Sequence, residues 1–274
     1  MSDFELGKFS YYDSLKMLHG SMMNIMGTRF DIVIIGKNQT ISESIWSKIE
    51  VELKRLNHIM NRFDKLSETS RINSSAADSR VGLSDEMWQI LSNCQIYHKK
   101  TFGLFDITLN NFNAIILNQV EKMVKFTSAE TSIDFGGYGK GYALKKIKEI
   151  LVEHNVEHCY ADFGNSSILA IGHHPHGDAW KVSIENPYKS AQILDEIELK
   201  DVTLSISGNT PMYSGHIIKP KTGKWVRDHK MISVLSDDPL DAEVLSTVFM
   251  IANEQETKKI TKNFNIHTIN EYRL

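Results

Sequence analysis

The pattern of hydrophobic and polar positions predicts a strand and a long helix near the start of the chain. Residues 30–35 (FDIVII) form a β-branched run bounded by Gly36, which is typical of a buried strand. Thr40 and Glu43 have the spacing of a capping box and predict the start of a helix. The polar stretch 65–78 has no periodicity of its own, so we expect a loop there, and its length favours a functional role. The apolar stripe of the helix consists of Ile45, Ile49, Leu53, Leu56 and Met60.

Two further helices follow, and the second begins at a glycine-rich turn. Ser84 starts a helix that extends to about residue 96. Residues 133–144 (IDFGGYGKGYAL) are typical of a strand end, a glycine turn and a helix start. Leu144, Ile147 and Leu151 share one face of that helix, which we therefore expect to be buried.

In the second half of the chain the apolar period changes from that of a helix to that of a strand. Apolar and polar residues alternate over 180–185 and 202–206, which predicts half-buried strands of an antiparallel sheet. A short strand at 231–235 precedes a helix that Asp238 caps and Pro239 starts, and a short helix and a final strand close the chain. We therefore expect an α+β fold in which antiparallel-rich sheets and packed helices form one interdigitated two-lobed body.

Composition narrows the classes of partner. The 274 residues carry a formal net charge of −3, and Lys and Arg are scattered, so nucleic acid is not expected as a partner. Cys94 and Cys159 form no C-x-x-C pair, and we expect buried thiols rather than a disulfide or zinc ligands. No run approaches the roughly 20 apolar residues of a membrane span.

The first 23 residues lack the basic start and the continuous apolar run of a signal peptide. We treat residues 1–23 as an N-terminal extension and residues 24–274 as a single domain. The expected compartment is the cytoplasm, although a chain trimmed of an export leader would look the same.

Gly136, Gly137, Gly139 and Gly141 make the glycine turn a candidate ligand site. Glycine opens backbone dihedrals that are closed to other residues and lets a ligand approach the main chain. The free N–H groups at the start of the next helix suit a phosphate or a metal-bound phosphate. The spacing matches neither the P-loop nor the dinucleotide-binding pattern. Taken alone, the turn is equally compatible with a tight connection that binds nothing.

Two further groups could carry chemistry. His216 precedes a rigid turn at Pro220, and it either contacts a ligand and transfers a proton or is bonded within its own turn. Glu243 and Thr247 share one helix face and could hold Mg²⁺, or they are a solvated glutamate and a threonine bonded to its own helix. The cluster 173–178 (HHPHGD) predicts a surface hairpin tip rather than a metal site.

In combination these motifs resemble the ApbE family of FAD:protein FMN transferases, over residues 26 to about 252. Each motif is weak alone, but the combination is specific. The matching segments are 26–28 (MGT), 67–73 (SETSRIN), 105–108 (FDIT), 133–142 (IDFGGYGKGY), 207–208 (SG), 216–223 (HIIKPKTG) and 242–247 (AEVLST).

The resemblance implies an enzyme that uses Mg²⁺ to split the pyrophosphate of FAD, releases AMP and attaches FMN to a Thr or Ser hydroxyl of a partner flavoprotein. The acceptor motif of the family is Asp-x-x-[Ser/Thr]-Gly-Ala-[Ser/Thr], and FAD would lie in a cleft between the two halves of the body. The implied base is His216, with the metal-linked carboxylate of Glu243 as the competitor. The implied metal ligands are the carbonyl of Gly137 and the side chains of Glu243 and Thr247. The implied contacts to FAD are Met26, Phe63, Asp106, Asp134, Lys140, His216 and Thr222.

Three positions depart from the family pattern. Glu243 stands where Asp is usual, Lys219 stands where Asp or Asn is usual, and residues 164–167 (GNSS) replace a Gly-Gly-acidic motif. There are two alternatives to the transferase, the first motivated by Glu243 and Lys219 and the second using the same implied metal site. One is a flavin-binding protein without catalysis, and the other is an FAD pyrophosphatase that releases FMN and AMP with water as the acceptor.

Overall fold

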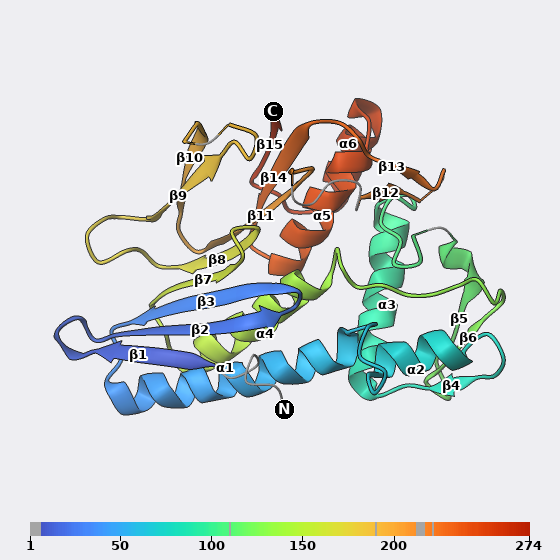
Figure 1. Ribbon diagram of the computed structural model, residues 1–274, viewed down its shortest axis with the longest axis horizontal. Coiled ribbons are helices and arrows are strands. Elements are labelled where there is room, and N and C mark those ends of the chain that lie inside the picture. The colour runs from blue at the N-terminus through green and yellow to red at the C-terminus, as the bar shows by residue number, and fades with distance from the viewer. Residues whose placement is uncertain (1–6, 110, 190, 212–216, 221) are drawn as a thin grey trace.

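The centre of the computed structural model is an antiparallel sheet of eight strands (Figure 1). The structure describes residues 7–109, 111–189, 191–211, 217–220 and 222–274. The described part of the first 23 residues supplies one edge strand and most of its neighbour, so it is continuous with the sheet. In spatial order the strands are β1 (Lys8–Tyr12), β2 (Met17–Ile25), β3 (Thr28–Ile35), β7 (His158–Phe163), β8 (Ser167–Ile171), β11 (Val202–Gly208), β14 (Lys230–Ser236) and β15 (Thr268–Arg273).

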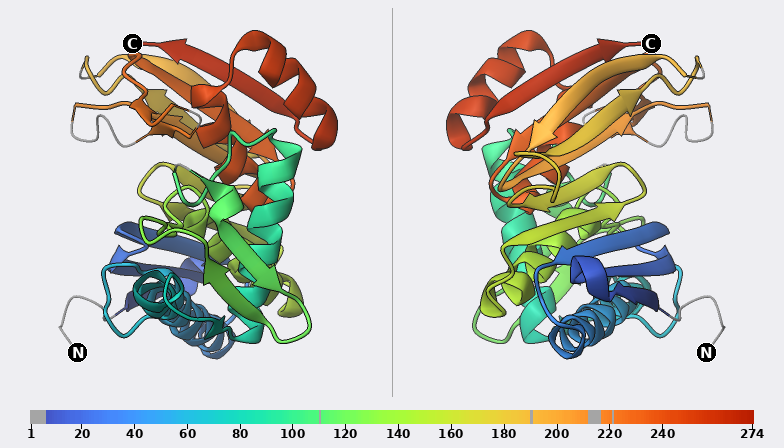
Figure 2. Two further views of the ribbon diagram at one scale, coloured as in Figure 1. Left: turned by 90° about the vertical axis from the view of Figure 1, so that its right-hand side faces the viewer. Right: turned by 90° about the vertical axis from the view of Figure 1, so that its left-hand side faces the viewer.

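Three helices cover one face of the sheet and build the main core with it (Figure 2). These are α1 (Gln39–Met60), which packs on β2, α4 (Gly139–Glu153), which packs on β8, and α5 (Pro239–Ile251), which packs on β11 and β14. The hairpin of β9 (Trp180–Glu185) and β10 (Ile193–Leu199) covers part of the other face. The predicted α+β class, with antiparallel sheets and packed helices, is confirmed.

The remaining elements flank this body. Beside the C-terminal end of α1 lie α2 (Glu68–Ser75), α3 (Asp85–Lys100) and a small sheet of β4 (Val81–Gly82), β6 (Met123–Phe126) and β5 (Ile115–Asn118) (Figure 1). β12 (Ile218–Lys219) pairs with β13 (Lys224–Trp225), and α6 (Glu254–Ile260) leads into β15. Among the described residues, no helix combines the length and the apolar character that crossing a membrane requires.

The apolar stripe predicted for α1 is confirmed, but the predicted capping box is wrong. All five stripe residues are buried. The helix begins earlier, and its N-cap is Asn38, whose side chain accepts a hydrogen bond from the N–H of Ile41 at 3.0 Å. Asparagine is among the best N-caps, and Asn38 rather than Thr40 satisfies a free N–H group at the start of this helix.

Part of the predicted loop at 65–78 is the helix α2. The Ser67 hydroxyl caps it by accepting from the N–H of Ser70 at 2.9 Å. Only Thr69 and Ile72 of this helix are buried. The prediction failed because two buried positions are too few to produce a periodic apolar pattern.

The segment before the glycine turn is not a strand, so this prediction is wrong. The N–H of Ile133 donates to Oδ1 of Asn73 at 2.7 Å, and the carbonyl of Ile133 accepts from Nδ2 of Asn73 at 3.0 Å. A side-chain amide therefore takes the place of a neighbouring strand. None of the four glycines of the turn has a positive φ, so the expected use of unusual dihedrals is also wrong.

Strand β11 is buried on both faces, although the alternation predicted one wet face. Val202 and Leu204 pack under the β9–β10 hairpin. Thr203 and Ser205 are also buried, on the side that α5 covers. Hydroxyl groups on a covered face need hydrogen-bond partners, and Ser205 finds them in the candidate site.

Two minor predictions have different outcomes. Residues 173–178 are largely exposed, but they connect two sheets instead of forming a hairpin tip, because β8 pairs with β7 and β11 whereas β9 pairs with β10. Cys94 and Cys159 are both free and buried, as expected, and burial raises the pKa of each thiol.

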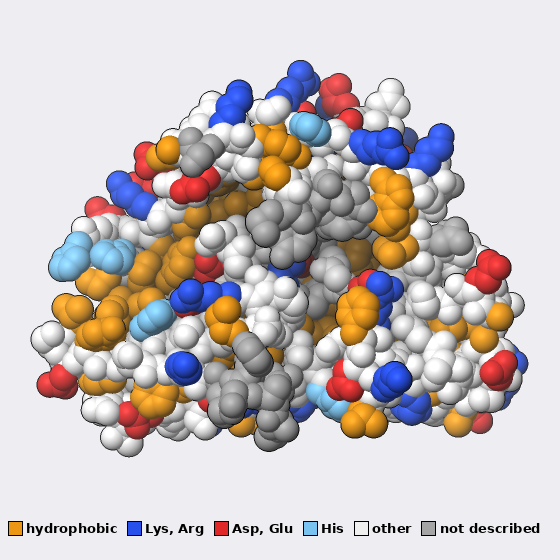
Figure 3. Space-filling view, viewed as in Figure 1, with side chains coloured by type: hydrophobic (Ala, Val, Ile, Leu, Met, Phe, Trp, Pro, Cys, Tyr) orange, Lys and Arg blue, Asp and Glu red, His pale blue; other side chains and the backbone are white. Residues whose placement is uncertain are grey.

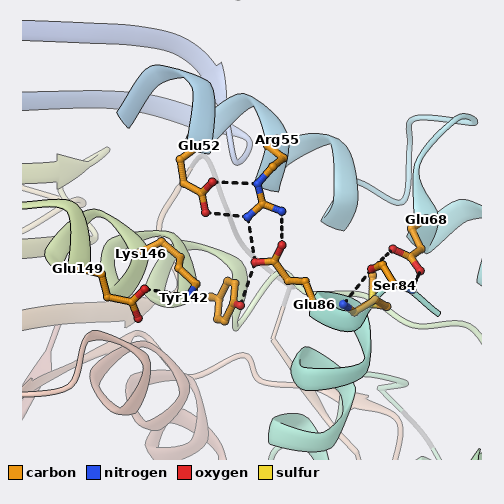
Figure 4. A network of polar contacts seen from close by, with 9 residues as sticks. Glu52, Arg55, Glu68, Ser84, Glu86, Tyr142, Lys146 and Glu149 are labelled. Atoms are coloured by element: carbon orange, nitrogen blue, oxygen red, sulfur yellow. Dashed lines mark hydrogen bonds and ion pairs between the residues drawn. The ribbon is translucent and has the colours of Figure 1, made fainter. Parts of the chain in front are cut away.

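A polar network joins α1, α3 and α4 (Figure 4). Arg55 of α1 donates to both carboxylate oxygens of Glu86 in α3, and Tyr142 of α4 donates to the same carboxylate at 3.0 Å. Burial by itself raises the pKa of Glu86, but hydrogen bonds from Arg55 and Tyr142 outweigh it, so the pKa lies below its ordinary value. The network fixes α4, and therefore the glycine turn at its N-terminal end.

The outer face of the sheet, opposite the helices, carries hydrophobic side chains beside the β9–β10 hairpin (Figure 3) and a charged cluster near them. Asp31 and Asp162 lie directly opposite each other on β3 and β7. Asp31 bonds to Arg29 at 2.6 Å and to His19 at 3.1 Å. Burial raises the pKa of Asp162 to about 6, and the charge of Asp31 adds to the effect.

We expect Asp162→Asn to stabilise the fold at neutral pH. The carboxyl binds its proton more tightly in the folded chain than at its ordinary pKa of 3.8, so stability falls as the pH rises from 3.8 to about 6. Each pKa unit is worth about 1.4 kcal/mol, which puts the gain from Asn at up to about 3 kcal/mol above pH 6. Urea unfolding at neutral and at acidic pH measures this gain. A gain that did not shrink in acid would contradict the assignment.

Candidate functional site

The glycine turn lies face to face with the start of helix α5. A Cβ atom added to Gly137 would lie 3.5 Å from Oγ1 of Thr247. A Cβ added to Gly141 would lie 2.5 Å from Cβ of Glu243 and 2.8 Å from the carbonyl oxygen of Pro239. Two motifs that are about 100 residues apart in the chain therefore form one site, whose close contact depends on the absence of a side chain at Gly141.

Glu243 is the central charged group of this site. Its side chain is 4% exposed, and Oε1 forms an ion pair with the ammonium of Lys140 from the glycine turn. Oε2 accepts hydrogen bonds from Oγ of Ser167 at 2.5 Å and from Oγ of Ser205 at 3.0 Å. The expectation that Glu243 lies on the same helix as Thr247 is met, but Glu243 is not a solvated glutamate. A buried carboxylate needs such partners, because an unpaired one is costly.

Hydroxyl groups continue from Glu243 to Thr247. Ser205 contacts Ser246 at 3.1 Å, Ser246 contacts Ser207 at 2.8 Å, and Ser207 contacts Oγ1 of Thr247 at 3.1 Å, all between oxygen atoms. The two side chains that the resemblance implies as metal ligands are thus connected through three serines. The Thr247 hydroxyl therefore bonds to a residue of strand β11.

Asp134 and Arg62 form a second polar pair at the glycine turn. Oδ1 of Asp134 accepts from the N–H of Gly136 at 2.7 Å, and Oδ2 lies 3.2 Å from Nε of Arg62. The Arg62 guanidinium lies over the ring of Phe63, 4.8 Å from its centroid, and the Phe63 residue is 81% exposed. A cation beside an exposed aromatic ring suits a ligand that combines phosphate with a flat ring system.

Met26 reaches the same turn from the β2–β3 hairpin. It has a positive φ of 50°, and its N–H donates to Oδ1 of Asn57 at 3.0 Å. A Cβ added to Gly139 would lie 3.7 Å from the Met26 sulfur and 3.9 Å from the Met60 sulfur. The structure therefore brings Met26 together with the glycine turn.

Of the other implied FAD contacts, Asp106 lies close to the glycine turn, because the carbonyl of the adjacent Ile107 accepts from the N–H of Asp134 at 2.8 Å. Asp106 accepts hydrogen bonds from the N–H and hydroxyl of Thr108 at 2.8 and 2.7 Å and from the N–H of Phe112 at 3.1 Å, so its described contacts are within its own loop. Thr222 is exposed in the β12–β13 turn, where its N–H donates to the carbonyl of Lys219 at 3.0 Å. His216 lies outside the described residues.

Sequence reasoning missed four residues of the site: Arg62, Ser167, Ser205 and Ser246. Ser205 lies at a polar position of an alternating strand, where the simplest interpretation is a solvated face. A hydroxyl in the middle of the apolar helix α5, at Ser246, was the one visible signal, because serine competes with helix hydrogen bonds unless its side chain has a partner.

The described residues contain no group of three or more His, Cys, Asp or Glu side chains that could hold a metal ion. The oxygen groups near the turn include the Glu243 carboxylate and the Thr247 hydroxyl, which are joined through three serines.

A family model described as the ApbE family matches residues 26–116 and 109–269 of the chain. An FAD:protein FMN transferase of Haemophilus influenzae is 23% identical over 286 residues, which cover 88% of this chain and 82% of the relative. One of Chlamydia pneumoniae is 24% identical and covers 96% of this chain and 93% of its own length.

Solved structures show the same architecture. The flavin transferase ApbE from Vibrio cholerae has a TM-score of 0.79 at 20% identity, covering 94% of this chain and 97% of that one. The ApbE protein from Thermotoga maritima has a TM-score of 0.78 at 19% identity, with coverages of 92% and 96%. At these identities the match establishes the fold, while the residues of the site have to be judged from their own geometry.

Proposed function

Because the chain belongs to the ApbE family, we propose that it is an enzyme that transfers FMN from FAD to a partner protein. The observation that carries the proposal is the meeting of the glycine turn with residues 207–208 and 242–247, three family-like motifs, at one buried carboxylate. Relatives that match most of the chain are named FAD:protein FMN transferases.

In the proposed reaction, the hydroxyl oxygen of an acceptor Thr or Ser bonds to the FMN-side phosphorus of the FAD pyrophosphate. The bond from that phosphorus to the bridging oxygen breaks, and AMP leaves with this oxygen. The hydroxyl proton passes to a base, for which His216 stays the predicted residue and Glu243 the competitor. We expect the acceptor to carry the motif Asp-x-x-[Ser/Thr]-Gly-Ala-[Ser/Thr].

The donor set of the site fits Mg²⁺. The proposed ligands are the carbonyl of Gly137 and the side chains of Glu243 and Thr247, all of them oxygens, which is the ligand type that Mg²⁺ requires. So few protein ligands leave coordination positions for water and for substrate phosphates. When bound, the ion would neutralise charge on the pyrophosphate.

The residues of the chain contribute positioning and charge, which is most of what phosphoryl transfer needs from a protein. Lys140 pairs with Glu243 and brings the positive charge of its ammonium to the glycine turn. Asp134 holds Arg62 beside Phe63, and we propose that this pair contacts FAD. The low exposure of the Glu243 side chain strengthens its ion pair with Lys140.

The test is incubation of the full chain with FAD, Mg²⁺ and an acceptor domain that carries the motif. We expect a covalently fluorescent acceptor band on a denaturing gel together with release of AMP. The matched control is the same acceptor with its Thr or Ser replaced by Ala, and a second control contains a chelator. Free FMN and AMP without a labelled band would support the pyrophosphatase. Intact bound FAD would support the flavin-binding protein.

A further inference from the structure

We propose that a chain of hydroxyl groups, anchored on Glu243, sets the direction of the Thr247 hydroxyl so that its oxygen stays free to bind a cation. Ser205, Ser246 and Ser207 are the positioning residues of this chain. The inference rests on the proposed function, because the cation is the one proposed there.

The connection is continuous from one proposed ligand to the other. Starting at Oε2 of Glu243, the oxygen distances are 3.0 Å to Ser205, then 3.1 Å to Ser246, 2.8 Å to Ser207 and 3.1 Å to Thr247. Ser205 and Ser246 are fully or almost fully buried. Water therefore does not compete for these two hydroxyls, and the hydrogen bonds within the chain decide how they point.

The carboxylate determines the first step. A carboxylate paired with the ammonium of Lys140 accepts hydrogen bonds and donates none. The single hydrogen of the Ser205 hydroxyl must therefore point to Oε2 of Glu243. Ser205 then has no hydrogen left for Ser246, so in their contact it is the acceptor.

The remaining steps follow from one hydrogen per hydroxyl. The hydrogen of Ser246 has three acceptors within reach: Ser205, Ser207 and the carbonyl of Glu243. The four contacts of the hydroxyl chain share four hydroxyl hydrogens, and with the hydrogen of Ser205 on Glu243 every contact contains a hydrogen only if Ser246 donates to Ser205. In that arrangement Ser207 donates to Ser246. Ser207 is then an acceptor for Thr247. The hydrogen of Thr247 is then committed to Ser207.

This direction matters because a cation binds the lone pairs of a hydroxyl and is repelled by its hydrogen. With its hydrogen held by Ser207, Thr247 presents lone pairs to a further partner, and a Cβ added to Gly137 would lie 3.5 Å from the same oxygen. Substituting a residue that hydrogen-bonds to a metal ligand and orients it typically lowers metal affinity by about 10-fold to 100-fold. The three serines are expected to act in this way.

The test is the binding of Mn²⁺ to the full chain without FAD, measured by electron paramagnetic resonance. Mn²⁺ is a suitable probe because it uses the same oxygen ligands as Mg²⁺. Ser246→Ala is expected to raise the dissociation constant about 10-fold, although it removes no proposed ligand. Without Ser246, the hydrogen of Ser207 can turn toward Thr247, which then points its own hydrogen into the site. Alanine is a better helix former than serine, so α5 should remain folded.

Ser207→Ala removes the member of the hydroxyl chain that follows Ser246, and it is expected to raise the Mn²⁺ dissociation constant by a similar factor. The matched control is Thr203→Val on the same strand, since Thr203 is buried and its hydroxyl has no hydrogen-bond partner in the part of the chain that the structure describes. This control should leave the Mn²⁺ constant unchanged.

The outcomes separate the two proposals. If the wild-type chain binds Mn²⁺ and neither Ser246→Ala nor Ser207→Ala weakens it, the hydroxyl chain is wrong and the proposed function stands. If the wild-type chain binds no Mn²⁺, or if Thr247→Ala leaves binding unchanged, the proposed cation site is overturned, and this inference with it.

Discussion

Glu243→Gln is expected to lower FMN transfer at least about 100-fold, because it removes the one buried charge at which the site is assembled. The amide keeps the size of the side chain and can still accept from Ser167 or Ser205. It loses the negative charge that pairs with Lys140 and that would hold a cation. The measurement is the initial rate of acceptor labelling at saturating FAD over a Mg²⁺ titration.

The matched control for Glu243→Gln is Glu149→Gln, which breaks another Lys–Glu pair on helix α4. Nζ of Lys146 lies 2.9 Å from Glu149, but the Glu149 side chain is 56% exposed, and exposed pairs contribute little. This variant should transfer FMN at the wild-type rate. A Glu243→Gln enzyme with near-normal transfer, indifferent to Mg²⁺, would remove Glu243 from the reaction.

The length of the Glu243 side chain decides what aspartate would do at this position. The extra methylene lets the carboxylate reach Ser167 and Ser205 on the sheet while it also meets Lys140. Aspartate is shorter by about 1.5 Å, so it cannot keep all of these contacts without movement of the backbone. Glu243→Asp should therefore reduce transfer as well. Higher activity than wild type would indicate that the site still fits the usual ligand of the family better.

Local signals in the sequence predicted the elements of the site better than the contacts between them. The start of α5 was visible because Asp238 caps it and Pro239 opens it, and Asp238 does accept from the N–H of Leu240 at 2.9 Å. The helix after the glycine turn was visible from its apolar face. Both predictions depend only on neighbours in the chain, which a sequence displays directly.

The partners of Glu243 depend on pairing between distant strands, and no local pattern reveals it. Ser167 and Ser205 meet because β8 and β11 pair in a register that places these two residues opposite each other. Alternation along β11 showed which residues share a face, but not that a helix covers the polar one. The same limit explains why α2 was predicted as a loop, since its burial depends on a core assembled from other parts of the chain.

Close packing of two helices is a role of the glycine turn that the sequence analysis did not predict. The room beside Glu243 does not come from Gly139, because a Cβ there would only touch Met26 and Met60 at ordinary distances. The room comes from Gly141, which faces the backbone of α5. The contact joins two helices, so it was visible only once their packing was known.

Gly141→Ala is therefore expected to destabilise the fold by about 2 kcal/mol or more, although alanine favours a helix by about 1 kcal/mol over glycine. The added Cβ would lie 2.5 Å from Cβ of Glu243, 2.8 Å from the carbonyl oxygen of Pro239 and 3.1 Å from Cα of Leu240. None of these atoms can rotate away, because each belongs to the backbone or is attached directly to it. Helices α4 and α5 would have to separate, and urea unfolding measures the cost.

Gly139→Ala is the matched control for this prediction, since Gly139 is also buried in α4 and a Cβ there meets nothing closer than 3.7 Å. It should leave the unfolding free energy unchanged or raise it slightly. Equal stabilities for the two variants would contradict the close contact at Gly141. If the helices do separate, Lys140 moves away from Glu243. Gly141→Ala should therefore lose FMN transfer even at temperatures where the protein is still folded. A loss of transfer that only accompanies unfolding would show that the contact supports the fold alone.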